Sequence, residues 1–276
     1  MRRGAVAAIS AGVIVVLALL VGAGLFTFTQ TDWGRARTGG YILDQLRTAT
    51  HGYVTVERFD GNLLTGATIV GLTITDSTRA PFVTADTIRA TYSLRDLIGK
   101  RIFLDNVRIV HPVVVVDRMP GGKWNYDRIY PRDTTRPPSP PGFLSWITLQ
   151  NVTVVDGRVT SHSPWAPASS LSPTKRDSVI RVAMSSIGRL NLNRVPGGFQ
   201  KTSDFRDIYG TFPLMRLEDP QDKRQIIDVS ALRMTAEPLK PPSVRVADTK
   251  GRFILLGDSL YFSNVTGALA SSRLSA

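Results

Sequence analysis

The segment between residues 102 and 125 constrains the fold more than any other part of the chain. Its sequence is IFLDNVRIVHPVVVVDRMPGGKWN. Apolar residues alternate with polar ones, which is typical of a half-buried strand. The phase of the alternation changes at Asn106, so that one apolar set precedes it (Ile102, Leu104) and another follows it (Val107, Ile109, Val113, Val115). A change of phase by one residue is what a β-bulge or a tight bend produces. We therefore predict bent strands here, with each apolar set on one face.

The same pattern returns twice along the chain. Residues 102–107 read IFLDNV, residues 147–152 read ITLQNV and residues 260–265 read LYFSNV. An asparagine occupies the same place in each copy, and asparagine tolerates the left-handed backbone conformation better than most residues. We therefore predict bulges at Asn106, Asn151 and Asn264, within an elongated sheet of repeated strand units.

A membrane anchor is predicted over residues 1–31. No charged side chain occurs between Gly4 and Thr31, and about 20 apolar helical residues cross a bilayer core. Arg2 and Arg3 precede the apolar run, which favours a cytoplasmic N-terminus and a single pass. The alternative is a cleaved signal peptide, but its apolar core would span only about 7–15 residues. The length of the run favours an uncleaved anchor.

Residues 32–52 are predicted to form an amphipathic helix next to the membrane. Ile42, Leu43, Leu46 and Ala49 fall on one helical face, and arginines are available to the other. This helix would cover the end of the sheet or lie at the lipid headgroups. Residues 53–276 are predicted to form a repetitive β-domain with short helices. Loops are expected at residues 131–141 and 161–177, which are rich in Pro and Ser. Apolar alternation continues to the last residues, so we expect the sheet to continue in a longer parent protein.

Composition and motifs argue against several classes of function. The formal net charge is +12, but no long Lys/Arg run or nucleic-acid-binding motif accompanies it, so an anionic membrane surface is the better partner. The chain has no cysteine, and His51, His111 and His162 lie far apart, so neither a disulfide nor a metal site is predicted. No catalytic or cofactor-binding motif occurs. We expect no enzyme activity and no cofactor.

The predicted strands share an apolar face that no long amphipathic helix follows to cover. Either a second sheet or lipid would have to pack against such a face. The residues predicted to line it are Val54, Val56, Val70, Leu72, Ile74, Ile88, Ala90, Tyr92, Ile102, Leu104, Val107, Ile109, Val113 and Val115.

The order of these features is similar to the start of a known family. An N-terminal apolar helix is followed by the turn GNLLTG at residues 61–66, an apolar strand with GLTI at 71–74, and SLRDLIG at 93–99. A strand pair then ends in PVVVVDR at 112–118, followed by GKWN at 122–125. Together these resemble the AsmA-like superfamily, which includes TamB. Residues 143–159 resemble the next unit of that family.

The resemblance implies a bacterial protein anchored in the inner membrane, with most of its chain in the periplasm. It implies a curled antiparallel sheet whose apolar groove conducts phospholipids between membranes, and no catalytic residues. It also implies a role in outer-membrane biogenesis and protein secretion, with an outer-membrane β-barrel protein as a partner. The alternative is a membrane-anchored β-sandwich module that binds proteins or glycans, with ordinary core residues in place of the lipid-binding ones.

Overall fold

The computed structural model describes residues 52–62, 66–93, 96, 101–129, 146–256, 259–269 and 272–275. The anchor predicted over residues 1–31, the helix predicted over 32–52 (apart from Gly52) and the Pro-rich segment 131–141 lie outside these residues. Within the described ranges, no helix is both long and apolar enough to cross a bilayer.

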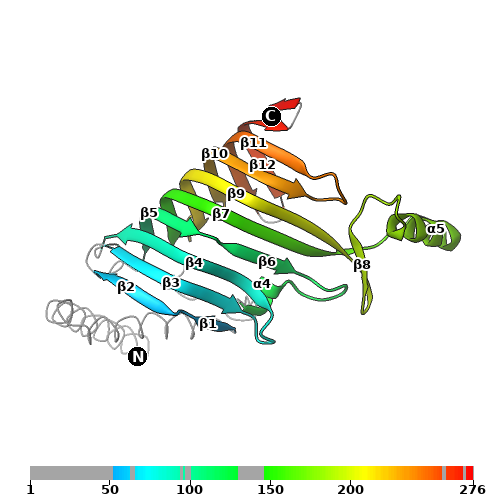
Figure 1. The fold of residues 1–276 in the computed structure, drawn as a ribbon, viewed down its shortest axis with the longest axis horizontal. Helices are drawn as coiled ribbons and strands as arrows, with labels where there is room; N and C mark the ends of the chain where they lie inside the picture. Colours follow the sequence, from blue (N-terminus) through cyan, green and yellow to red (C-terminus); the bar gives the residue numbers. More distant parts are fainter. Residues whose placement is uncertain are drawn as a thin grey trace, which may run out of the picture.

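The described residues form one 13-stranded sheet, which confirms the prediction of a mainly β protein. The central path of the sheet runs β1-β3-β4-β5-β7-β9-β10-β11-β12-β13, with β2, β6 and β8 paired beside it. The strands are β1 (Tyr53–Thr55), β2 (Arg58–Asn62), β3 (Gly66–Thr75), β4 (Pro81–Tyr92), β5 (Ile102–Val110), β6 (Val113–Asp117), β7 (Ile147–Trp165), β8 (Leu192–Val195), β9 (Gly198–Glu218), β10 (Gln225–Glu237), β11 (Val244–Leu256), β12 (Ser259–Leu269) and β13 (Ser272–Ser275). Figure 1 shows them side by side as one curved sheet.

The prediction of an antiparallel sheet is correct for most strand pairs, but the sheet is mixed, because β5 and β6 both run parallel to β7. A parallel pair needs a crossover connection instead of a hairpin. In this protein the crossover connection leaves β6, includes helix α4 (Asn125–Ile129) and ends where β7 begins beside the start of β5. The two closest copies of the repeat therefore lie next to each other, with Ile102 opposite Ile147 and Leu104 opposite Leu149.

The predicted bulges at Asn106 and Asn264 are confirmed, whereas Asn151 shares their left-handed backbone without a register shift in its ladders. Asn106, Asn151 and Asn264 have positive φ angles of 50°, 48° and 53°, and the register of the ladders shifts beside Asn106 and Asn264. Asn106 and Asn151 are neighbours on β5 and β7. We call these three residues the first bend line.

A second set of left-handed residues crosses the sheet nearer to α4, and the sequence did not predict it. It consists of Gly71, His111, Asp156, Asp207 and Asp248, with φ between 47° and 64°. We call these residues the second bend line. Each adds one residue to the alternation of its strand, and such insertions bend a strand and increase its twist.

The loop predicted over residues 161–177 is shorter than expected, because only residues 166–172 lie outside strand and helix. Strand β7 continues to Trp165, because His162 and Trp165 pair with Thr202 and Phe199 of β9. Helix α5 (Pro173–Met184) follows. Ser172 and Pro173 form a helix start signal, since proline is favoured at the first helical position.

Candidate apolar binding face

One face of the sheet carries rows of apolar side chains, which are interrupted at Gly210 and Thr249. Strand partners in register point to the same face, so the ladder pairs trace each row from strand to strand. The first row lies on the far side of the first bend line from α4. It comprises Tyr92, Leu104, Leu149, Met215, Ile227, Phe253 and Phe262.

Two further rows lie between and beyond the bend lines. The middle row comprises Ile69, Ile88, Ile109, Val154, Gly210, Leu232 and Thr249. The third row, nearest to α4, comprises Val54, Ile74, Val83, Val114, Val159, Phe205, Ala236 and Val244. We call the surface formed by the three rows the apolar face.

The bend lines keep the three rows on one side of the sheet. Val107 and Val152 are 2% and 0% exposed, and Leu104, Ile109, Leu149 and Val154 all pack against their cluster. Leu104 and Val107 are three residues apart, so strict alternation would place them on opposite faces. The left-handed Asn106 between them adds the residue that restores the phase.

The second bend line acts in the same way on β7. A Cβ atom at Gly157 would lie 3.1 Å from Cγ1 of Val154, so residue 157 points to the same face as Val154. Alternation then carries this face to Val159, and its ladder partner Val114 extends it to β6. The rows on both sides of Asp156 therefore form one continuous surface.

Most predicted residues that line the face are found there. The ladder pairs and the cluster around Val107 place Val54, Leu72, Ile74, Ile88, Ala90, Tyr92, Ile102, Leu104, Val107 and Ile109 on it. Val56 lies between β1 and β2, outside the strands.

Three predicted residues lie on the opposite face, which corrects the sequence interpretation. Val113 and Val115 pair with Arg158 and Thr160, which flank Val159 of the apolar face. His111, with a φ of 47°, shifts the phase after Ile109, so Val114 continues the face instead. Val70 also lies on the opposite face, where it pairs with Arg58 of β2 and Thr87 of β4. Gly71 shifts the phase of β3 in the same way as His111 does after β5.

The opposite face, which we call the polar face, carries ion pairs between strands beside apolar residues such as Val113, Val115 and Ile226. Arg158 Nη2 lies 2.9 Å from Oδ2 of Asp204, whose Oδ1 also accepts a hydrogen bond from the Thr160 hydroxyl. Burial opposes ionisation of Asp204, but the bonds from Arg158 and Thr160 outweigh it and lower the pKa of this carboxyl. Arg252 and Asp228 make a similar pair across β10 and β11. The two faces of the sheet therefore differ in chemistry, since the polar face carries these ion pairs.

The apolar face is only one layer deep in the described part of the chain. Many of its side chains remain partly exposed, and Phe262 at the end of the first row is 54% exposed. Burial does, however, raise the pKa of the Tyr92 phenol. The residues that the structure describes contain no second sheet and no cluster of His, Asp and Glu side chains suited to a metal ion.

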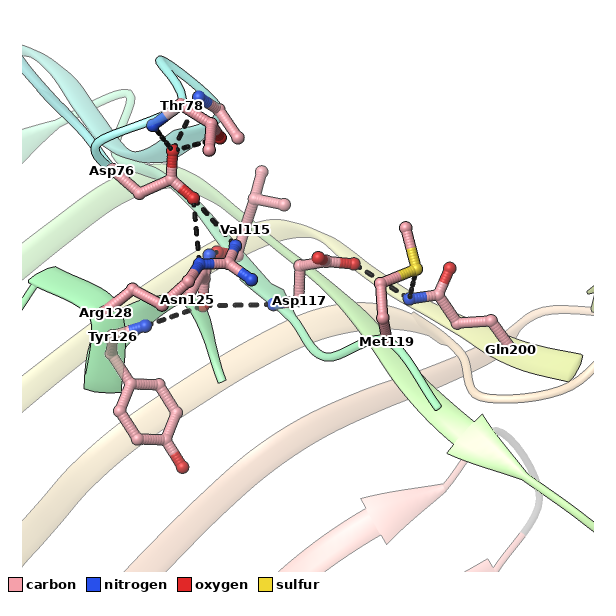
Figure 2. Close-up of polar contacts among 10 residues, drawn as sticks. Asp76, Thr78, Val115, Asp117, Met119, Asn125, Tyr126, Arg128 and Gln200 are labelled. Carbon is pink, nitrogen blue, oxygen red and sulfur yellow. Dashed lines mark hydrogen bonds and ion pairs between the residues drawn. The ribbon is translucent and has the colours of Figure 1, made fainter. Parts of the chain in front are cut away.

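A buried polar network closes one end of the sheet. The Asp76 carboxylate is fully buried; its Oδ2 accepts hydrogen bonds from Arg128 of α4, and its Oδ1 accepts bonds from Thr78 and the Ala80 amide. Burial alone would raise the pKa of Asp76, but these bonds outweigh it and lower the pKa below the usual 3.8. Figure 2 shows the Asp76–Arg128 pair beside Asn125.

Asn125 ties α4 to β6. Its Oδ1 accepts bonds from the amides of Asp117 and Tyr126, and its Nδ2 donates to the Val115 carbonyl at 2.6 Å. Gln200 of β9 reaches Asp117 in turn (Figure 2). The GKWN segment of residues 122–125 thus has a structural role. We call this end of the sheet, where β3, β6 and β7 finish, the α4 end.

Comparisons with known proteins do not identify the chain: no protein-family model matches it. No curated protein matches it significantly.

Proposed function

We propose that this protein is a membrane-anchored protein of the bacterial cell envelope whose apolar face binds and conducts phospholipid acyl chains. The observation that carries the proposal is the set of apolar rows, which remain in register from strand to strand on one side of a single sheet. If these rows were an ordinary globular core, other parts of the protein would bury them. They remain partly exposed instead, and large exposed apolar patches mark binding sites.

The physical properties of the face suit acyl chains. Burying hydrocarbon contributes about 0.8 kcal/mol per methylene, so partial shielding of one acyl chain already stabilises a complex. Hydrophobic attraction is non-directional, and neighbouring rows offer similar side chains. A lipid acyl chain that moves from the third row to the first therefore replaces its contacts with similar ones. The energy barrier to movement along the strands is low for this reason.

The proposed anchor would lie at the α4 end of the face. Strand β1 pairs with the last residues of β3, Tyr53 opposite Thr75. The chain therefore leaves the sheet toward residues 1–51 at that end. An inner-membrane anchor there would place the third row nearest to the membrane and direct the first row into the periplasm.

The order of sequence features supports membership of the AsmA-like superfamily. On that basis we propose a role in outer-membrane biogenesis and a bacterial outer-membrane β-barrel protein as a partner. The alternative of a β-sandwich that binds proteins or glycans receives less support, because a sandwich needs a second sheet against the first and the described residues form one.

Site-specific photocrosslinking tests the lipid-binding proposal. Val114 and Val115 are adjacent on β6 but lie on opposite faces. A photoreactive amino acid at Val114, in the full chain within native membranes, should crosslink to phospholipid, whereas the same residue at Val115 should crosslink several-fold less. Mass spectrometry of the adducts measures both yields. Equal yields at the two positions, or no lipid adduct at Val114, would refute lipid binding on this face.

A further inference from the structure

Helix α5 stands apart from the sheet in Figure 1, at the same end as α4. It is inserted between the end of β7 at Trp165 and the start of β8 at Leu192. Since β1 also begins at the α4 end, the helix and the path toward the proposed anchor share one end of the sheet.

The position of α5 is fixed by contacts at its C-terminal end. The Lys240 ammonium group donates a hydrogen bond to the Ser185 carbonyl at 2.9 Å, and the Lys240 amide donates to the Arg189 carbonyl at 2.7 Å. Ala183 is buried. The β10–β11 connection therefore supports the helix, so α5 is an ordered projection of the molecule.

The exposed surface of this projection includes several large apolar side chains among polar ones. Val179, Val182 and Met184 are exposed, and Ile187 just beyond the helix is 80% exposed, the highest value among the large apolar residues of the described chain. Val179 and Val182 are three residues apart and share one helical face. Several exposed apolar side chains close together on an ordered projection indicate a surface that a partner covers.

Basic side chains accompany these apolar ones. Lys175 lies on the same helical face as Val179 and Val182, and Arg181 is adjacent, whereas Asp177 is the only acidic residue of α5. Within the described part of the chain, the Lys175 and Arg181 side chains make no hydrogen bond or ion pair. Exposed apolar side chains flanked by unpaired cations are typical of segments that lie in the headgroup region of an anionic bilayer.

We propose that α5 and the segment through Ile187 dock on the surface of an anionic membrane, with Val182 and Ile187 inserted between headgroups and Lys175 and Arg181 near lipid phosphates. The proposal rests on the membrane anchoring of the proposed function. A weak contact suffices, because tethering by the anchor would convert docking into an intramolecular step at high effective concentration. Two contacts at one end of the sheet would fix its orientation relative to the bilayer.

The absence of cysteine allows a unique fluorescent probe at a chosen site. We would attach an NBD dye to Val182→Cys or Ile187→Cys in the full chain, reconstituted in nanodiscs of phosphatidylcholine alone or with 30% phosphatidylglycerol. In the anionic discs we expect a blue-shifted emission with at least about threefold higher intensity. A probe at Thr211→Cys, on the polar face of the sheet, should not respond.

Charge reversal at Lys175 and Arg181 to Glu should abolish the response of the Val182 probe, while circular dichroism and crosslinking of lipid at Val114 remain unchanged. A probe at Val182 that stays in water on anionic discs would overturn the proposal. So would one that is shielded only in native membranes, since that result would assign the surface to a protein. Failure of the proposed membrane anchor can be told apart from failure of α5 docking. Without an anchor, the protein would not float together with neutral vesicles in a density gradient.

Discussion

Among single residues, Asp76 contributes to stability in a way that can be tested directly. Its carboxylate is fully buried and receives two hydrogen bonds from Arg128, so Asp76→Asn keeps the side-chain shape but removes the charge that these bonds need. Hydrogen bonds to charged groups contribute about 1.5–3 kcal/mol. We expect Asp76→Asn to lower the free energy of unfolding by about 2 kcal/mol, measured by urea denaturation. A loss no greater than that of Asp60→Asn, in the exposed Arg58–Asp60 pair, would contradict this role.

The same carboxylate should make stability depend on acid pH. The pKa of Asp76 is lower in the folded protein than its usual 3.8. Its contribution is therefore complete above about pH 4 and is lost as the pH falls below 3.8 toward the folded value, because the unfolded chain binds the proton first. The difference in unfolding free energy between the wild type and Asp76→Asn should shrink over that range. A difference that stays constant down to pH 2 would show that the charge is not responsible.

At the scale of strands, the sequence pattern predicted some bends and missed others for identifiable reasons. The first bend line was predictable because an asparagine recurs at one place in a repeated motif. The second was not, since its residues are of three types, and the run of four valines at 113–116 shows no alternation that could reveal the phase after His111. For this reason, the sequence pattern assigns Val113 and Val115 to the wrong face. Strand direction was also hidden, because it depends on the crossover through α4.

The parallel pairing of β5 and β7 predicts a specific crosslink. Phe103 and Thr148 are partners in the parallel register, and paired strands lie about 4.8 Å apart, within the Cα separation that a disulfide bridges. Phe103→Cys with Thr148→Cys should oxidise to an intramolecular disulfide, seen as a mobility shift on non-reducing gels. The control pair, Phe103→Cys with Thr153→Cys, should remain reduced, since residue 153 is opposite Arg108. The opposite outcome would indicate that the strands are paired in another register.

Across the whole molecule, the two bend lines and the apolar face depend on each other. Each strand on a bend line must gain one residue where it bends, and without that insertion its apolar side chains would point to opposite faces on the two sides of the bend. Left-handed Asn, Asp, Gly and His residues supply the insertion on neighbouring strands. The sheet can therefore curve and still present one continuous apolar surface along strands such as β7, whose 19 residues extend about 60 Å at 3.3 Å per residue.

Continuity of the face predicts how one charge would affect lipid movement. Leu232 lies in the middle row, opposite Gly210 and Thr249, while its neighbour Ala231 is opposite Thr211 on the polar face. A carboxylate at residue 232 would meet the acyl chain halfway along the sheet, and contact between hydrocarbon and an unpaired charge costs several kcal/mol. Leu232→Asp should therefore slow transfer of a fluorescent phospholipid between vesicles about tenfold or more, since each 1.4 kcal/mol in a barrier is a factor of ten. Ala231→Asp introduces the same charge one residue away on the opposite face and should leave the rate close to that of the wild type. Equal rates for both variants, at matched folded fractions, would show that lipid does not move along the apolar face.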